Sequence, residues 1–212
     1  MVEASFNVIA AHGQLCVGKD TLCDYLVTKL NKGKKKELWK RNAFANAVKD
    51  VFCNAFGYDR KFIEEWKRKE EKPDNFMVTV RNALQKIGDG FREIKPDIWI
   101  DIVLREQKNI IISDGRYLNE AKKVREKNGV NILIYRAGYI NNDPNPSEST
   151  LKPIVEYCRD TIPDGKIYHS TLVRYPDGLE NYDIFIRNDG DVAAFYKKID
   201  KYVIPYVLEK LN

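Results

Sequence analysis

The chain has 212 residues, of which 43% are hydrophobic and 32% charged, and its formal net charge is +5. This length is enough to bury the core of one domain, and no run approaches the roughly 20 apolar residues of a membrane-spanning helix. The four cysteines form no CxxC pair and the two histidines lie far apart, so neither a zinc site nor a disulfide framework is indicated. The N-terminus has no signal-peptide pattern, and we expect a soluble, intracellular protein with no membrane partner.

The positive charge is concentrated in two short clusters, at residues 34–36 and 67–69. Binding to nucleic acid calls for a broader basic patch with interleaved aromatic residues, so we expect no nucleic-acid partner. A small ligand rich in phosphate also accounts for a mildly positive site.

The chain opens with a strand, a glycine loop and a helix. Residues 6–11 (FNVIAA) form an apolar run typical of a strand buried on both faces of a parallel sheet. After the loop, Leu22, Leu26 and Leu30 recur at helical spacing. This order predicts the first half of a βαβ unit.

Four further short apolar segments predict strands at residues 37–44, 109–113, 130–135 and 183–186. Helices are predicted within residues 45–105, 118–128 and 192–211, and a Pro/Asn-rich loop or lid at 138–153. Five strands alternating with helices predict an α/β fold with a doubly wound five-stranded parallel sheet, whose ligands bind at the carboxyl ends of the strands.

The strongest motif is GQLCVGKDT at residues 13–21, which fits GxxxxGK between a strand and a helix. In such a P-loop the backbone N–H groups after Gly13 and around Gly18 bind phosphate, and Lys19 reaches the β- and γ-phosphates. Thr21 is placed to hydrogen-bond a phosphate oxygen. Asp20 stands where the usual motif has Ser or Thr. Its carboxylate suits either of two roles, binding a metal ion directly or through water, or orienting an acceptor.

A second cluster, IIISDGR at residues 110–116, brings a carboxylate and a guanidinium to the end of a buried strand. Asp114 resembles the second metal-site acid of P-loop enzymes, and Arg116 suits stabilisation of a transferring phosphoryl group. Glu120, four residues later, is expected near Arg116. An Asp that caps the next helix, with Arg in a structural ion pair, is the alternative.

A third feature is a helical face that carries Arg81, Gln85 and Gly88, followed by Asp89 and Trp99. Arginine binds phosphate through two hydrogen bonds, glutamine offers a base edge both a donor and an acceptor, and an aromatic ring offers a stacking surface. A helix that only packs a core is the alternative.

These motifs together resemble viral and phage-type deoxynucleoside monophosphate kinases. The pattern is GKDT after a strand, R-x-x-LQ-x-IG-x-x-x-R before Trp99, D-x-R-x-x-x-E after a buried strand, and a late N-D-G, over roughly residues 6–150 and 183–208. The resemblance implies the P-loop NTPase fold of nucleoside monophosphate kinases, ATP with Mg²⁺ as donor, and a deoxynucleoside monophosphate as acceptor.

The resemblance also implies three sets of site residues. The donor is held by Gly13, Gly18, Lys19, Asp20 and Thr21, with Asn188 at its base, although a turn that only caps the last helix explains Asn188 equally well. The catalytic residues are Lys19, Asp20, Asp114 and Arg116, with Asp20 and Asp114 serving the metal. The acceptor is contacted by Lys49, Arg81, Gln85, Gly88, Asp89, Trp99 and Glu120.

We expect one kinase domain over residues 1–212, with an acceptor-binding helical insertion at about 45–105 and a lid with an extra segment at about 138–182. The extra segment contains Arg159, His169 and Arg174 and exceeds the usual link in this family. It alters acceptor choice, elaborates the surface or makes an oligomer contact such as a homodimer. The expected location is the cytoplasm, of the host cell if the source is viral.

The nearest alternative is a phosphomevalonate kinase of the animal type, which shares a GKD P-loop and a lid similar to residues 147–149 here (SES). Gln85 and Trp99 suit a nucleotide base better than an isoprenoid phosphate. A GTP-dependent switch would need an NKxD motif after a strand, and the sequence has none. A nucleic-acid end-processing kinase rests on the basic clusters alone.

Overall fold

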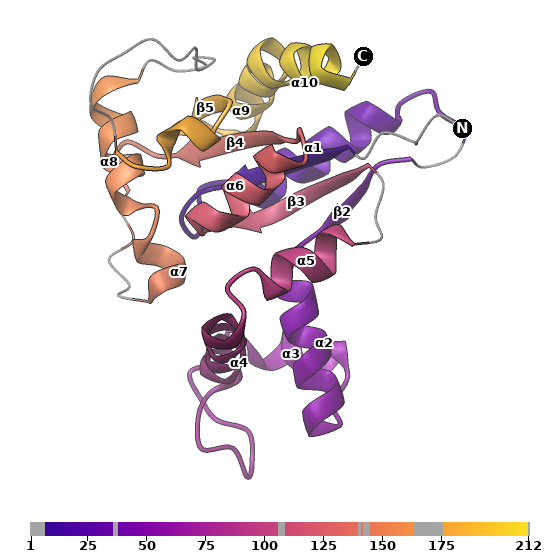
Figure 1. The fold of residues 1–212 in the computed structure, drawn as a ribbon, viewed down its shortest axis with the longest axis vertical. Coiled ribbons are helices and arrows are strands. Elements are labelled where there is room, and N and C mark those ends of the chain that lie inside the picture. The colour runs from indigo at the N-terminus through magenta and orange to yellow at the C-terminus, as the bar shows by residue number, and fades with distance from the viewer. Residues whose placement is uncertain are drawn as a thin grey trace. The chain divides into compact units, whose positions relative to one another are not determined.

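The structure, a computed structural model, describes residues 7–35, 38–105, 109–139, 141, 145–162 and 176–211. The chain divides into two compact units (Figure 1). The sheet unit comprises Met1–Asn42 and Gln107–Asn212, and the helical unit comprises Ala43–Glu106. Within the described ranges, no helix combines the length and apolar character needed to cross a membrane.

The sheet unit is built on five parallel strands in the order β2-β3-β1-β4-β5, as the sequence predicts. β1 is central and buried along its whole length, because β3 and β4 pair with its two edges. The loop that follows β1 therefore lies at the middle of the carboxyl edge of the sheet, where α/β proteins bind ligands. The strands are β1 Val8–His12, β2 Lys40–Asn42, β3 Ile110–Gly115, β4 Val130–Tyr135 and β5 Ile184–Arg187.

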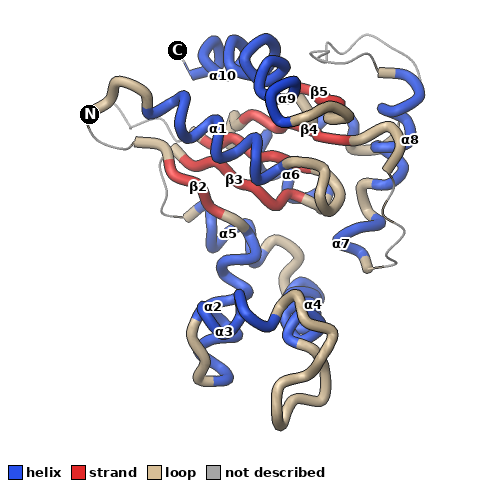
Figure 2. The backbone as a smooth tube through the Cα atoms, turned by 180° about the vertical axis from the view of Figure 1, so that it is seen from behind, coloured by secondary structure: helices blue, strands red, loops and turns tan. Residues whose placement is uncertain are grey.

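Helices cover both faces of this sheet, because successive side chains of a strand point to opposite sides. Ile132 and Ile134 of β4 pack in a cluster with α1, α9 and α10, whereas Leu133 and Tyr135 pack in another with α6 and α8. Figure 2 shows α1 in front of the sheet and α6 behind it. The helices of this unit are α1 Lys19–Asn31, α6 Leu118–Glu126, α7 Pro146–Ser149, α8 Lys152–Thr161, α9 Val192–Lys198 and α10 Ile204–Leu211.

Three segments differ from the predicted ones. β2 is shorter than 37–44, because the Asn31 side chain accepts hydrogen bonds from the amides of Leu38 and Trp39 at 3.0 Å each, and α2 already begins at Phe44. The final helix holds a π-helical turn, Ile199–Val203, just before Pro205, which has no N–H to donate. The predicted loop at 138–153 contains α7 and the start of α8. Residues 6 and 37 of two predicted strands, and His169 and Arg174, lie outside the described residues.

The helical unit contains four helices in its described part, within the span where the sequence predicts helix. The first three of them pack around a small core of Phe52, Ile63, Val80 and Ala83. Gly57, at φ 72°, adopts the left-handed conformation that ends the first of them. The helices are α2 Phe44–Phe56, α3 Arg60–Trp66, α4 Val80–Ile94 and α5 Ile98–Leu104.

A buried polar network lies under the carboxyl edge of the sheet. His12 Nε2 is 2.8 Å from Asn131 Oδ1, and Asn131 Nδ2 donates to the carbonyls of Ala121 and Asn181. Because the amide nitrogen of Asn131 is committed to these two carbonyls, its oxygen accepts the Nε2 proton of His12. Burial lowers the pKa of His12 to about 4, so the ring is neutral at physiological pH.

We predict that Gly115→Ala destabilises the protein by about 1–3 kcal/mol, as overpacking of a core does. A Cβ atom on Gly115 would lie 2.2 Å from Nδ1 of the buried His12 ring. Urea unfolding measures the change. Gly138→Ala is the control, because a Cβ there meets no atom within 4 Å and its cost should stay below about 0.5 kcal/mol. Equal stability of the two variants would contradict the packing seen around His12.

Candidate active site

The P-loop is held in place by close contacts at both of its glycines. Gly13 has φ 146° and Gly18 has φ 108°, values that residues with a side chain rarely adopt. A Cβ atom would lie 2.4 Å from the Ile134 carbonyl oxygen at Gly13 and 2.5 Å from Asn188 Nδ2 at Gly18. Helix α1 begins at Lys19, so the loop leads into a helix N-terminus, where unpaired N–H groups and the helix dipole favour an anion.

Lys19 is buried within this loop. Its Nζ atom donates to the carbonyl oxygens of Gly13 at 2.7 Å and Gln14 at 2.6 Å. Burial lowers the pKa of Lys19 to about 7, the positive charge of Arg116 adds to this effect, and the Asp114 carboxylate opposes it. The ammonium is therefore costly in the protein alone, and a bound phosphate would stabilise it.

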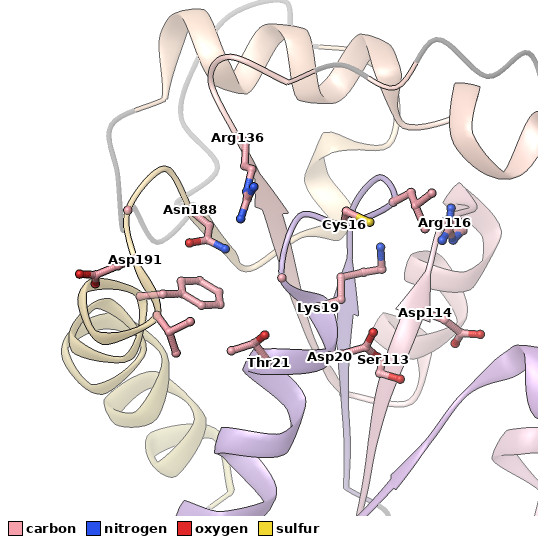
Figure 3. Close-up of a pocket in the computed structure, with 15 residues that line it drawn as sticks. Cys16, Lys19, Asp20, Thr21, Ser113, Asp114, Arg116, Arg136, Asn188 and Asp191 are labelled. Atoms are coloured by element: carbon pink, nitrogen blue, oxygen red, sulfur yellow. The ribbon is translucent and has the colours of Figure 1, made fainter. Parts of the chain in front are cut away.

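A pocket of about 340 Å³ opens beside the P-loop (Figure 3). In the figure, Asp114 and Arg116 lie on one side of Lys19, and Arg136, Asn188 and Asp191 on the other. The fold thus brings together the donor and catalytic residues that the sequence predicts, from α1, the end of β3 and the turn after β5, except that Gly13 does not line the pocket. The polar side chains lining the pocket are those of Cys16, Lys19, Asp20, Thr21, Ser113, Asp114, Arg116, Arg136, Asn188 and Asp191.

Asp20 forms an ion pair with Arg41 of β2, which also binds Asp24 at 2.8 Å. The Asp20 side chain remains 75% exposed. In the described part of the chain, no three His, Cys, Asp or Glu side chains gather in a group that would hold a metal ion. The carboxylates of Asp20 and Asp114 at one pocket instead match the way proteins bind Mg²⁺, with one or two carboxylates, water and phosphate oxygens.

Asn188 braces the P-loop. Its side chain is buried, and Nδ2 donates to the Val17 carbonyl at 2.9 Å. The cap of α9 is Asp191, whose carboxylate accepts from the Ala194 amide at 2.7 Å. Asn188 thus contacts the P-loop and lines the pocket, while a neighbouring residue caps the last helix.

Glu120 does not line this pocket. Its buried carboxylate accepts hydrogen bonds from the backbone amides of Arg116 at 2.7 Å and Tyr117 at 3.0 Å. Glu120 therefore closes the turn between β3 and α6 and fixes the backbone at Arg116. A direct contact with the acceptor stays a prediction.

The other predicted acceptor residues lie in the helical unit. Arg81 is exposed and Gln85 partly exposed on α4, whereas Gly88 is buried. Trp99 is only 1% exposed and its Nε1 donates to the Gly88 carbonyl at 2.9 Å, so its ring packs this unit and presents no open face for a base. Two of the three charged members of this set form ion pairs, Asp89 with Arg92 at 3.3 Å and Lys49 with Glu64 at 2.8 Å.

The sequence did not single out Arg41, Arg136, Gln14 or Glu148 as functional residues. Arg136 directly follows the predicted strand 130–135, and that position at the carboxyl edge was the available signal. Arg41 lies inside the predicted strand 37–44, which gave no such signal. Gln14 occupies a variable position of the P-loop motif. The signal for Glu148 was the run Asn145-Pro-Ser-Glu148, typical of a capped helix start, in which Asn145 Oδ1 accepts from the Ser147 amide at 2.9 Å.

The fold and the pocket define a P-loop nucleotide-binding protein. In sequence, the chain is 29% identical over 202 residues to a protein of Acanthamoeba polyphaga mimivirus named "Putative deoxynucleotide monophosphate kinase", a match that covers 86% of this chain and 88% of that protein. In structure, shikimate kinase from Acinetobacter baumannii, in complex with shikimate, aligns over 95% of both chains with a TM-score of 0.47 and 13% identity. No protein-family model matches. The viral relative confirms the resemblance that the motifs indicated and supports a kinase, a phosphotransferase, as the class of enzyme.

We predict that Asp20→Asn changes the free energy of unfolding by less than about 1 kcal/mol, because exposed ion pairs contribute little to stability. Chemical denaturation of the variant and the wild type measures the difference. Glu126→Gln removes the carboxylate of another exposed ion pair, with Lys123, and should have a similarly small effect. A much larger loss for Asp20→Asn alone would make Asp20 a structural residue.

Proposed function

We propose that the chain is an ATP-dependent deoxynucleoside monophosphate kinase that forms the diphosphate and ADP. The observation that carries this proposal is a pocket lined by Lys19 of the P-loop together with Asp114 and Arg116. The mimivirus relative, named a deoxynucleotide monophosphate kinase, supports the choice of acceptor. The phosphomevalonate kinase alternative has no such relative in its support.

The P-loop and its surroundings suit the phosphates of ATP. The amides at the start of α1 and the Lys19 ammonium offer positive charge at one end of the pocket. Arg136, Asn188 and Asp191 line the other side and are the groups nearest to a donor nucleoside. Binding of phosphate at the P-loop also favours the charged form of Lys19, whose pKa is lowered to about 7 in the protein alone.

The residues present fit Mg²⁺. Asp20, Thr21 and Asp114 place hard oxygen ligands at the pocket. Because the Asp20–Arg41 ion pair is exposed, replacing the Arg41 guanidinium by Mg²⁺ at the Asp20 carboxylate costs little free energy. When bound, Mg²⁺ would neutralise charge on the donor phosphates.

We predict that Asp20→Asn raises the Mg²⁺ concentration needed for half-maximal turnover, because an amide oxygen binds a cation more weakly than a carboxylate. A magnesium titration of initial rates measures it, and Glu126→Gln serves as the control. A titration identical to that of the wild type would refute the metal role.

Exposed side chains on α4 suit the acceptor. Arg81 offers two parallel donors to a phosphate, and Gln85, one turn later, offers a donor and an acceptor to a base edge. Lys49 is a weaker candidate, because Glu64 already binds its ammonium at 2.8 Å.

The proposed reaction is an in-line transfer. An oxygen of the acceptor phosphate forms a bond to the γ-phosphorus of ATP, the bond from that phosphorus to the bridging oxygen breaks, and ADP leaves with the electron pair. Lys19 and Arg116 stabilise the negative charge on the transferring group, while the P-loop amides hold the donor still. Little further chemistry is required of the protein.

Release of ADP from ATP and Mg²⁺, measured in parallel with each deoxynucleoside monophosphate, the ribonucleotides and mevalonate 5-phosphate, tests the function. We expect turnover with at least one deoxynucleotide, and the pattern identifies the base. Turnover with mevalonate 5-phosphate alone would replace the proposal with the phosphomevalonate kinase alternative. No ADP release with any acceptor would reject the proposed function.

We predict that Lys19→Ala and Arg81→Ala change different kinetic constants. Lys19 acts on the transferring group, so its loss lowers kcat by about 100-fold or more, whereas loss of Arg81 mainly raises KM for the acceptor. Steady-state kinetics with both substrates varied separates the two effects. Lys29→Ala, a substitution at an exposed lysine of α1, is the control. Unchanged kinetics in either variant would remove its assigned role.

A further inference from the structure

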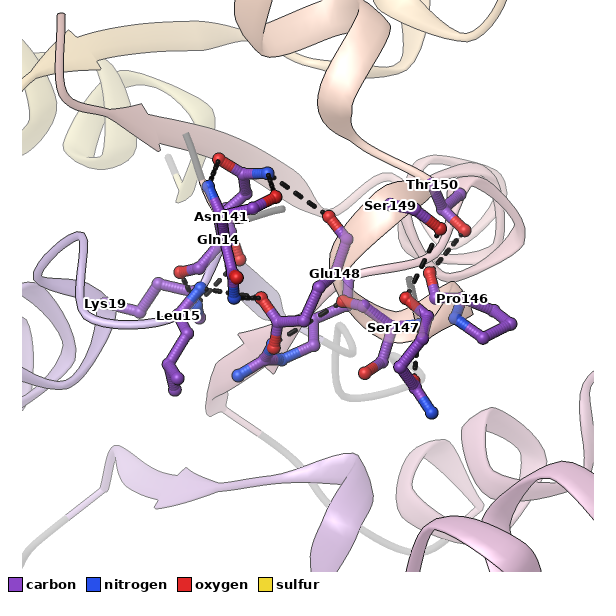
Figure 4. A network of polar contacts seen from close by, with 12 residues as sticks. Gln14, Leu15, Lys19, Asn141, Pro146, Ser147, Glu148, Ser149 and Thr150 are labelled. Carbon is purple, nitrogen blue, oxygen red and sulfur yellow. Dashed lines mark hydrogen bonds and ion pairs between the residues drawn. The ribbon is translucent and has the colours of Figure 1, made fainter. Parts of the chain in front are cut away.

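The segment around α7 is joined to the tip of the P-loop by side-chain hydrogen bonds (Figure 4). Gln14 is 1% exposed, and its Nε2 donates to the carbonyls of Asn141 and Glu148 at 3.2 Å each. Its Oε1 accepts from the Asn141 amide, also at 3.2 Å. The P-loop tip and this segment are therefore held together by residues more than a hundred positions apart.

Glu148 lies at the centre of this contact. Its carboxylate forms an ion pair with Arg116, and Oε2 accepts from the Leu15 amide and from Asn141 Nδ2 at 2.9 Å each. The side chain is 2% exposed, and a carboxylate so buried is stable only when charged and polar partners surround it. The Arg116 guanidinium also reaches the Ser147 carbonyl at 3.5 Å. The direction of the Arg116 side chain is thus set by α7.

The local sequence makes α7 a rigid platform for Glu148. Pro146 occupies the first turn, where its fixed φ suits a helix. Asn145 caps the turn, and Thr150 Oγ1 returns a hydrogen bond to the Pro146 carbonyl at 2.6 Å. The Glu148 side chain therefore projects from a turn whose backbone is fixed at both ends.

We propose that Glu148 is a positioning residue of the phosphoryl-transfer site, which aligns the Arg116 guanidinium. The inference rests on the proposed function, because it assumes that Arg116 acts on the transferring group. It goes further by assigning the residue that orients Arg116.

The pocket geometry favours a role of Glu148 in aligning Arg116. It disfavours an inhibitory role, in which the Glu148 carboxylate would itself occupy the phosphate position. Leu15 and Arg116 line the pocket, whereas Glu148 does not, so its carboxylate binds these groups from behind and leaves the pocket open. Lys19 keeps its own partners, the carbonyls of Gly13 and Gln14. Glu148 thus fixes the direction of Arg116 without occupying the space of a phosphate.

The kinetic test compares Glu148→Gln with Glu126→Gln, the same substitution at an exposed ion pair. ADP release is measured with acceptor and, as slow hydrolysis, without it. Misplacing a group that acts on the transferring phosphoryl lowers kcat more than it changes substrate affinity, so we expect kcat to fall about tenfold or more for Glu148→Gln, with KM for ATP within about threefold. Glu126→Gln should match the wild type.

Glu148→Gln in an Arg116→Ala background distinguishes positioning of Arg116 by Glu148 from a general loss of structure. If Glu148 acts through Arg116, Glu148→Gln lowers the rate less than about twofold once Arg116 is gone. An equal loss in both backgrounds, or a faster enzyme after Glu148→Gln, would overturn the proposal.

Thermal unfolding of the ligand-free variants tests the contact independently of any acceptor. Breaking a buried ion pair leaves one charge without its partner, so the double variant should lose less Tm than the sum of the two single losses. Strictly additive losses would overturn the proposal. If Glu148→Gln alone does not fold, recovery of folding in the double variant supports the contact, and Glu148→Asp then provides the kcat comparison.

Failure of the proposed function is recognised separately. A wild type that turns over none of the acceptors rejects the proposed function, while hydrolysis without acceptor and the unfolding comparison still decide the role of Glu148. Loss of coupling in either measurement rejects Glu148 as a positioning residue even when a deoxynucleotide is phosphorylated.

Discussion

The site depends on how closely the P-loop backbone passes its neighbours. Gly13 lies against the β4 backbone and Gly18 against Asn188, with no room for a Cβ atom at either. These contacts fix the two ends of the loop, and residues of α7 fix its tip. Because the loop is restrained at three points, its amides and Lys19 are aimed before any phosphate arrives. Such preorganisation lowers the cost of binding and of phosphoryl transfer.

Two ion pairs at the pocket differ in burial. Arg116 with Glu148 is buried and defines direction, whereas Arg41 with Asp20 is exposed and exchanges readily. Among the described residues, Lys19 forms no ion pair with a carboxylate. Its ammonium donates to carbonyl oxygens, and its pKa is lowered to about 7. Of the two groups proposed to act on the transferring phosphoryl group, Lys19 is therefore the one whose charge is costly without a bound anion.

Local patterns predicted the five strands, the P-loop and the pocket residues around Lys19, because strand burial and the GxxxxGK spacing are encoded by neighbours in sequence. The patterns misjudged the ends of β2, where Asn31 binds the backbone of residues 38 and 39. They also suggested an open face for Trp99, which the structure buries against Gly88. Glu148 was missed as a site residue because its partners, Leu15 and Arg116, are brought to it only by the fold.

The buried ring of His12 has a consequence for how this sequence can change. The ring fills the space beside Gly115, which directly follows the pocket residue Asp114. A side chain at position 115 would meet less obstruction if position 12 held a residue smaller than histidine. The two positions are distant in sequence and belong to different motifs, yet a change at one alters the cost of a change at the other.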